Sequence, residues 1–262
     1  MSFATIERAG ATTLRVLQKE IEQMEKKVRI AGGIALTKTA KIAQKNMQTE
    51  MMRVFDRPTR WTLNATYVRP ATKQNNNEVK IGLKDAELKN RGVPPVNHLY
   101  PQIMGGTRQQ KRHEVALQRI GVLPPGWRIV PGQGAELDRY GNMKSQQIIQ
   151  IMSYFRAFGE QGYKANSTAQ TRKRLQRGTK KKAGRSYFVA YPGRERTKHL
   201  QPGIYVKRIS ALGSAIKPVM IFVKEARYAP RLQWYKIVND TFERHLDDEF
   251  EKQIEIGLAR GR

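Results

Sequence analysis

The chain has 262 residues and no cysteine, with 49 Lys or Arg against 22 Asp or Glu, and this composition excludes disulfides, thiolate zinc sites and cysteine nucleophiles. No stretch approaches the roughly 18 apolar residues that cross a bilayer, and the first residues lack the apolar core of a signal peptide, so we expect a soluble protein made in a cytoplasm without a membrane partner. A net charge of +27 repels itself in a compact chain, which predicts that nucleic acid or acidic protein neutralises it.

A first helix is expected near the N-terminus, because five apolar residues recur at spacings of three and four and therefore share one helix face. These residues are Leu14, Leu17, Ile21, Met24 and Val28. The pattern lasts only about two heptads, which favours a helix laid on a sheet over a free coiled coil. Gly32 and Gly33 are expected to interrupt this helix before a second helical segment that extends to Phe55.

Strand patterns follow. Residues 61–68 and 78–84 alternate apolar and polar side chains, and the turn-forming cluster 74–77 lies between them, which predicts an antiparallel hairpin. Three more strands are expected later in the chain, at residues 186–191, 203–209 and 218–223.

The middle of the chain, residues 85–141, is rich in Gly and Pro and is expected to be ordered but largely irregular. Thr107 is the expected cap of a short helix that Gly121 closes. Asn142 is the expected cap of a second helix with an apolar stripe.

A last helix is expected to begin near Pro230, with one buried stripe and one acidic outer face. The expected buried stripe comprises Leu232, Tyr235, Phe242, Leu246, Phe250 and Ile254. The acidic face, a candidate interface, comprises Asp240, Glu243, Asp247, Asp248 and Glu251. Acidic and basic faces on one small protein favour head-to-tail contact between copies or docking into a ring.

These elements predict an α+β fold. Its centre is an antiparallel sheet of about four or five strands packed by long N- and C-terminal helices, with a loop-rich insertion and a basic arm. Residues 1–84 and 186–262 form the predicted core domain, residues 85–163 the insertion and residues 164–185 the basic arm.

The basic arm holds nine Lys or Arg and no acidic residue. Aromatic residues only flank it, at Tyr163, Tyr187 and Phe188, which argues against base stacking and sequence-specific readout. Two alternative partners for the basic arm remain, the DNA backbone and an acidic protein surface. The candidate contacts are Arg172, Lys173, Arg174, Arg177, Lys180, Lys181, Lys182 and Arg185.

Few residues suggest catalysis. The four histidines, His98, His113, His199 and His245, occur in unrelated contexts, and no phosphate-binding loop occurs. Glu136 and Asp138 form the best candidate for a Mg²⁺ site in phosphodiester chemistry. A turn acid that caps the next helix or pairs with Arg139 is the simpler interpretation. No catalytic residue, metal ligand or cofactor is therefore assigned.

Several strings within residues 58–151 are distinctive: PTRWTLNATYVRPATK, KIGLKD, YPQIMGGTRQQKRHEVALQRIGVLPPGW and LDRYGNMKSQQIIQI. With them, the chain resembles tailed-bacteriophage and prophage virion proteins found among head-tail joining and minor tail genes. Its plan of an N-terminal helix, a basic sheet and a long C-terminal helix is also similar to the minor tail protein Z and tail-completion family. It departs from that family by the Gly/Pro-rich insertion.

The resemblance implies a non-enzymatic structural protein of the phage neck or tail. Such a protein is made in the host cytoplasm and works as an oligomer with portal, connector or tail-tube rings, close to the end of the packaged DNA. The resemblance brings no catalytic residues and no cofactor. Two alternatives remain, a protein that binds the DNA backbone without sequence specificity and a Mg²⁺-dependent nuclease that uses Glu136 and Asp138.

Overall fold

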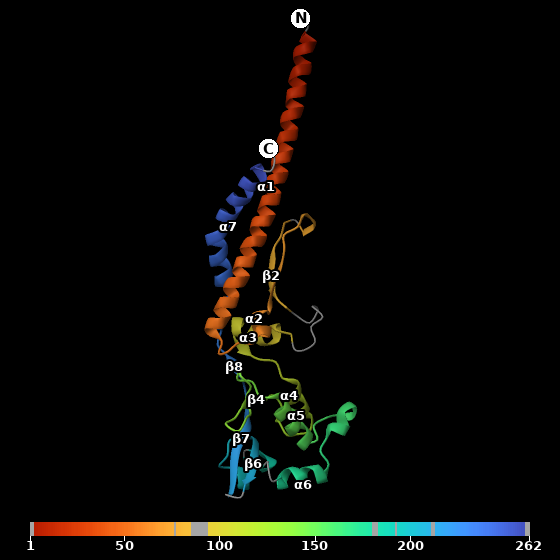
Figure 1. Ribbon diagram of the computed structural model, residues 1–262, viewed down its shortest axis with the longest axis vertical. Helices are drawn as coiled ribbons and strands as arrows, with labels where there is room; N and C mark the ends of the chain where they lie inside the picture. The colour runs from red at the N-terminus through yellow and green to blue at the C-terminus, as the bar shows by residue number, and fades with distance from the viewer. Residues whose placement is uncertain are drawn as a thin grey trace. The chain divides into compact units, whose positions relative to one another are not determined.

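Figure 1 shows the computed structural model, in which the chain divides into two compact units. Unit 1 comprises residues 1–103 and 230–262, and unit 2 comprises residues 104–229. The structure describes residues 3–75, 77–84, 94–179, 183–191, 193–210 and 213–259, and of residues 3–12, 161 and 210 it describes the backbone only. The predicted α+β class, with long terminal helices and antiparallel sheets, is confirmed.

Unit 1 is built on two long helices that pack against each other, α1 (Phe3–Val54) and α7 (Trp234–Ala259) (Figure 1). The predicted break at Gly32 and Gly33 is wrong, because α1 runs through both residues. Glycine costs a helix interior about 1 kcal/mol relative to alanine. A Cβ on Gly32 would lie 3.7 Å from Cε2 of Phe250, an ordinary contact, and one on Gly33 would lie 3.3 Å from Oδ1 of Asn77, a tight contact.

The predicted hairpin is confirmed in unit 1, although its first strand is shorter than expected. Strand β1 (Thr66–Arg69) pairs antiparallel with β2 (Lys80–Leu83), and the short helix η1 (Lys73–Asn75) lies between them. Residues predicted as the start of the first strand instead form α2 (Arg60–Leu63). The Oγ1 of Thr59 accepts the backbone N–H of Thr62 and caps this helix.

A small apolar core joins these elements to α3 (Val96–Met104) and to the segment before α7. Its buried residues are Met47, Met51, Ala65, Leu99 and Leu232. Leu232 precedes α7, and its backbone N–H donates to the carbonyl oxygen of Gln102 at 2.9 Å. The helix therefore begins at Trp234, later than predicted, and Tyr235, expected in the buried stripe, is 62% exposed.

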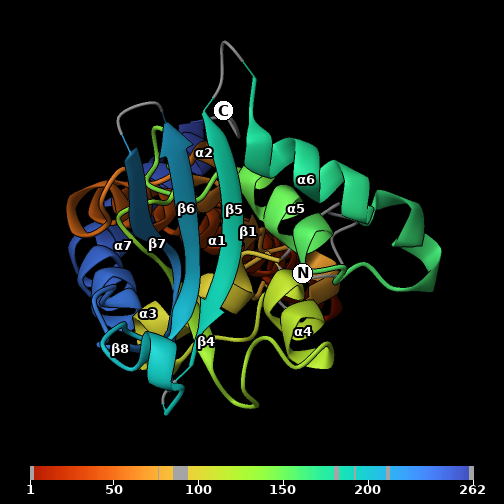
Figure 2. The same cartoon turned by 90° about the horizontal axis from the view of Figure 1, so that it is seen from below.

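Unit 2 contains the larger sheet, with the strand order β4-β7-β6-β5 and antiparallel pairing throughout. Its strands are β4 (Arg128–Pro131), β5 (Gly184–Ala190), β6 (Gly203–Ser210) and β7 (Gly213–Val223), of which β5, β6 and β7 confirm the three later strand predictions. Figure 2 shows β5, β6 and β7 side by side, with α6 next to β5. A separate pair joins β3 (Gly106–Thr107) to β8 (Arg227–Tyr228).

The helices of unit 2 are shorter than the sequence predicts. They are α4 (Arg112–Arg119), α5 (Ser145–Tyr154), α6 (Ala169–Arg177) and the short helices η2 (Glu160–Ala165) and η3 (Glu195–Thr197). Thr107 does not cap α4, because it pairs with Arg227 in the β3–β8 ladder. Asn142 does not cap α5, because it closes a turn with Asp138.

The core of unit 2 lies between the sheet and helices α4 and α5. Its buried residues are Leu117, Leu123, Ile129, Ile151, Met152, Ala157, Tyr187, Ile204, Val206, Val219, Met220 and Phe222. The four-stranded sheet thus packs against helices from the middle of the chain, whereas α1 packs against α7 and the β1–β2 hairpin. The predicted segment boundaries at residues 84, 163 and 185 do not coincide with the two units.

Candidate functional site

The strongly basic segment 164–185 contains an ordered helix, α6, which lies against strand β5. The Oγ1 of Thr168 accepts a backbone N–H of the first turn and caps the helix. Leu175 is the apolar side chain by which α6 contacts the core of unit 2. The basic segment is therefore held to the sheet at the C-terminal part of this helix.

A glycine at the start of β5 permits this close approach. Gly184 is buried, and a Cβ at this position would lie 2.0 Å from the carbonyl oxygen of Gln176 in the last turn of α6. No side chain tolerates such a distance, so the backbone would have to move. The sequence shows this glycine only as part of a basic run, with nothing to indicate its contact.

Three of the predicted contact residues form one exposed face of α6. Lys173, Arg174 and Arg177 are exposed and lie within one helical turn of each other, while Arg172 is half-buried. Within the described part of the chain, none of these four side chains forms an ion pair. Lys180, Lys181 and Lys182 lie outside the described residues.

Arg185 does not belong to this face, although the sequence groups it there. It lies in β5, where its Nη1 donates to Oε1 of Gln150 at 3.2 Å and lies 3.8 Å from Oε1 of Glu136. Arg208, its direct neighbour in β6, approaches the same Glu136 oxygen at 3.9 Å. The Arg185 side chain is half-buried beside these partners on the sheet and does not belong to the exposed face of α6.

Glu136 and Asp138 contact different groups and do not form one site. Glu136 faces the two arginines described above, whereas the carboxylate of Asp138 accepts the backbone N–H groups of Tyr140 and Asn142 at 2.8 and 2.9 Å. The bond from Asn142 is the largest of the influences that hold the pKa of Asp138 below its usual value. Asp138 is thus the turn acid of the simpler interpretation. No group of three or more described His, Cys, Asp or Glu side chains is placed to hold a metal ion.

A buried ionic cluster that sequence analysis missed ties α4 to β4. Glu114 is fully buried, and its carboxylate accepts the backbone N–H of Lys111 and of Ile129, each at 2.7 Å, together with the guanidinium of Arg108. Burial alone would raise the pKa of Glu114, but these hydrogen bonds outweigh it and lower the pKa. The only signal in the sequence is an acid placed three residues after a helix cap.

His113 lies next to this cluster. Burial lowers its pKa to about 4; the carboxylate of Glu114 opposes that change, and the cations Lys111 and Arg108 add to it. The imidazole is consequently neutral at pH 7. By its exposed surface His113 is half-buried, beside the fully buried Glu114.

The acidic face predicted for the last helix lies on α7 in unit 1. Glu243, Asp247, Asp248 and Glu251 are exposed, and Asp240 is half-buried. Residues 240, 243, 247 and 251 follow each other at spacings of three and four and so form one row. The row is about 16 Å long at 1.5 Å per residue. The remaining acid of this stretch, Glu249, instead faces α1 and lies 3.5 Å from Nζ of Lys38.

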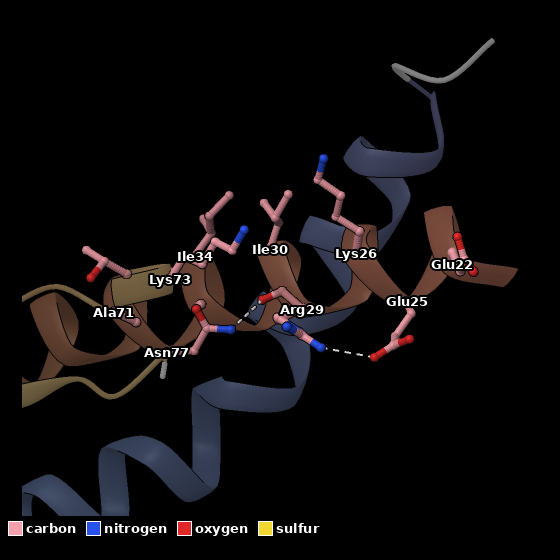
Figure 3. A pocket seen from close by; sticks show the side chains of 11 residues that line it. Glu22, Glu25, Lys26, Arg29, Ile30, Ile34, Ala71, Lys73 and Asn77 are labelled. Carbon is pink, nitrogen blue, oxygen red and sulfur yellow. Dashed lines mark hydrogen bonds and ion pairs between the residues drawn. The ribbon is translucent and has the colours of Figure 1, made fainter. Parts of the chain in front are cut away.

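A groove of about 390 Å³ lies between α1 and the turn of the β1–β2 hairpin (Figure 3). Asn77 lines it and donates from Nδ2 to the carbonyl oxygen of Arg29 at 3.2 Å. The Arg29 guanidinium is in turn paired with Glu25 at 3.0 Å. Ile30 and Ile34 line the groove from α1. The hairpin turn is therefore fixed to the middle of α1.

None of the helices in the described residues is long and apolar enough to cross a membrane. No protein-family model, no curated protein and no solved structure matches this chain.

Proposed function

We propose that this chain is a structural protein of a bacteriophage virion, in the neck or tail, which assembles with portal-proximal or tail-tube rings and does no chemistry. The observation that supports this proposal is the uneven distribution of charge. Unit 2 carries 25 Lys or Arg against six Asp or Glu, a formal net charge of +19, whereas α7 in unit 1 presents a row of acids to solvent.

Complementary faces of this kind orient protein partners. The exposed cations of α6 match in sign the acidic row of α7 on a neighbouring copy, or an acidic face of another virion protein. Such contacts contribute more to orientation and association rate than to affinity, and they weaken as salt is added. Repeated head-to-tail contacts generate a ring when the rotation between copies closes.

Binding to the DNA backbone is the second candidate, and one observation favours it. Lys173, Arg174 and Arg177 are exposed on one face of α6, and none has an acidic partner among the described residues. Phosphate contacts by such a face would make affinity fall by about 0.9 in log units per contact for each tenfold rise in salt. A virion protein close to the packaged genome can use the same face for both partners.

Electron microscopy of particles produced without this protein tests the proposal. We expect full heads that lack tails, or tails that fail to attach. Normal infectious particles would overturn the proposal.

A salt titration of binding to duplex DNA separates the two candidates. The test variant replaces Lys173, Arg174 and Arg177 with Glu, and the control replaces three exposed cations elsewhere in unit 2, Arg112, Lys217 and Lys224, with Glu. Tight binding by the purified protein that only the α6 variant loses would favour the DNA-binding function. Weak binding that both variants lose equally would favour assembly.

A further inference from the structure

Unit 1 exposes two apolar surfaces. The first is a row on the N-terminal part of α1 whose side chains are 45–68% exposed: Leu14, Leu17, Ile21, Met24 and Val28. The sequence-based expectation that this row lies on a sheet is therefore wrong. The second is a groove of about 470 Å³ between strand β2 and the start of α7. Its apolar lining comprises Val79 and Ile81, just before and within β2, and Trp234, Tyr235, Val238 and Phe242 from α7.

Backbone groups without a partner border this groove on its β2 side. The N–H of Lys84 donates to the carbonyl oxygen of Ala65 in the hairpin, and such bonded pairs alternate along an antiparallel ladder. Gly82 therefore directs its N–H and C=O toward β1, whereas Val79 and Ile81 direct theirs away from it. Of the described residues, none from β1 lines the groove, so these groups point to the groove side. Within the same described residues, no hydrogen bond reaches them.

The other edges of the hairpin and of the four-stranded sheet are covered. At β4, the N–H of Ile129 donates to Oε1 of Glu114 at 2.7 Å and its carbonyl oxygen accepts from Arg108 at 3.0 Å, and helix α6 lies against β5. At β1, the carbonyl oxygen of Thr66 accepts from Nε2 of Gln44 at 3.0 Å. Proteins cover edge strands in such ways because an uncovered edge pairs readily with another chain. Among the edges of these two sheets in the described residues, residues 79–83 at β2 form the open edge.

An extended backbone is the partner that the open edge fits. An added strand binds such an edge through backbone hydrogen bonds, and every second side chain of the strand points to the same face. Side chains on one face would enter the apolar groove. Those on the other face would lie beside Lys80 and Lys84, where Arg69, opposite Lys80 in β1, adds a third cation. These cations outnumber Glu78, whose Oε2 lies 3.4 Å from Nζ of Lys80, so acidic side chains complement this face.

We propose that the open edge binds an extended segment of a partner protein, in which apolar residues alternate with acidic ones, as an added antiparallel strand. Directly opposite residues of an antiparallel pair carry their side chains on the same face. Each apolar residue of the partner that lies opposite Val79 or Ile81 therefore directs its own N–H and C=O toward β2. The N–H groups of the acidic residues point away from β2. This difference between the two sets of N–H groups distinguishes strand addition from charge attraction.

A heptapeptide that alternates Glu and Val, with blocked ends, is the probe for the full-length protein. In one form every Glu is N-methylated, which leaves the N–H groups that would face β2. In the other form every Val is N-methylated, which removes them. We expect the first form to bind and to slow hydrogen exchange of the Val79 and Ile81 amides several-fold, and the second form to bind at least several-fold more weakly. Both forms carry the same charge, so unspecific attraction to a protein of net charge +27 affects them equally.

Variants of the protein test the groove and its charged rim. Lys80→Glu with Lys84→Glu should weaken binding of the Glu-methylated peptide several-fold. Tyr235→Ala should do the same, because it removes from the groove a side chain that is 62% exposed and lies outside the buried core. The matched charge control is Arg15→Glu with Lys19→Glu, two exposed cations of α1 that do not line the groove. This control should bind the peptide like the natural chain.

Three outcomes with the peptides would overturn the proposal: no binding, binding of the Val-methylated form as tightly as the other form or more tightly, and unchanged hydrogen exchange at Val79 and Ile81. Equal losses of binding in the Lys80 and Lys84 variant and in its charge control would overturn it as well. None of these measurements requires particles, so they are independent of the proposed virion function.

Discussion

Arg108 and Glu114 form a buried ion pair between α4 and β4, with Nη1 of the arginine 2.8 Å from Oε2 of the glutamate. The glutamate side chain is fully buried and the arginine side chain is 10% exposed. The guanidinium also donates to the carbonyl oxygen of Ile129 in β4. This one pair therefore connects the loop before α4, α4 itself and the edge strand of the sheet.

Removing one partner should destabilise unit 2 strongly, because it leaves the other charge buried without compensation. We expect Glu114→Gln to lower the free energy of unfolding by about 3 kcal/mol. Chemical denaturation measures this loss. Replacing both partners, with Arg108→Met and Glu114→Leu, should recover part of it, and a double variant less stable than the single one would contradict this account.

The lowered pKa of His113 predicts that the folded protein loses stability under mildly acidic conditions. Its pKa is about 4 in the folded protein against 6.5 for the free side chain, so the unfolded chain binds a proton that the folded chain does not. The contribution of neutral His113 to the free energy of unfolding is therefore complete above pH 6.5. The free energy of unfolding then falls by roughly 1–3 kcal/mol as the pH drops toward 4. Between pH 6.5 and 4.5, the free energy of unfolding of the His113→Gln variant should depend less on pH than that of the natural chain. Glu114, whose pKa is also lowered, loses its contribution only at more acidic pH.

Gly184→Ala should detach α6 from the sheet. The added methyl group meets the backbone of Gln176, which cannot rotate away, and overpacking of this kind costs about 1–3 kcal/mol. Faster hydrogen exchange of the α6 amides would report the change. Gly257→Ala in α7 is the control, since a Cβ there meets no atom of the described residues within 4 Å and should be neutral or slightly stabilising.

Charge reversal on the two proposed faces should be reciprocal if they bind each other. Replacing Lys173, Arg174 and Arg177 with Glu should prevent incorporation into particles, and so should Asp247→Lys with Glu251→Lys. Combining both sets in one chain should restore part of the incorporation, because opposite charges again meet between copies. Quantification of the protein in purified particles gives the result. Lack of any rescue would indicate that the two faces bind different partners.

Local patterns predicted the three later strands well, because they contain short apolar runs that are largely buried, residues 204–206 in β6 and 219–222 in β7. They failed where distant parts of the chain decide the structure. Thr107 has the chemistry of a helix cap, yet pairing with Arg227 makes it part of a strand. Arg185 has the sequence context of the surface cations around it, yet it lies in β5 next to Glu136, which is far away in sequence. Periodicity likewise identified the apolar row of α1 but could not show that its first part stays exposed.

The two glycines in α1 also determine where the exposed row points. Phe250 contacts the helix at Gly32 and Asn77 contacts it at Gly33, from two different elements. With neighbours on both sides, α1 cannot rotate about its own axis at this level. The helix transmits that fixed rotation toward its N-terminus, so residues 14–28 leave the folded unit at a defined angle. A bulkier residue at Gly33 would have to displace the side chain of Asn77, and so would loosen the contact that holds the hairpin turn to α1.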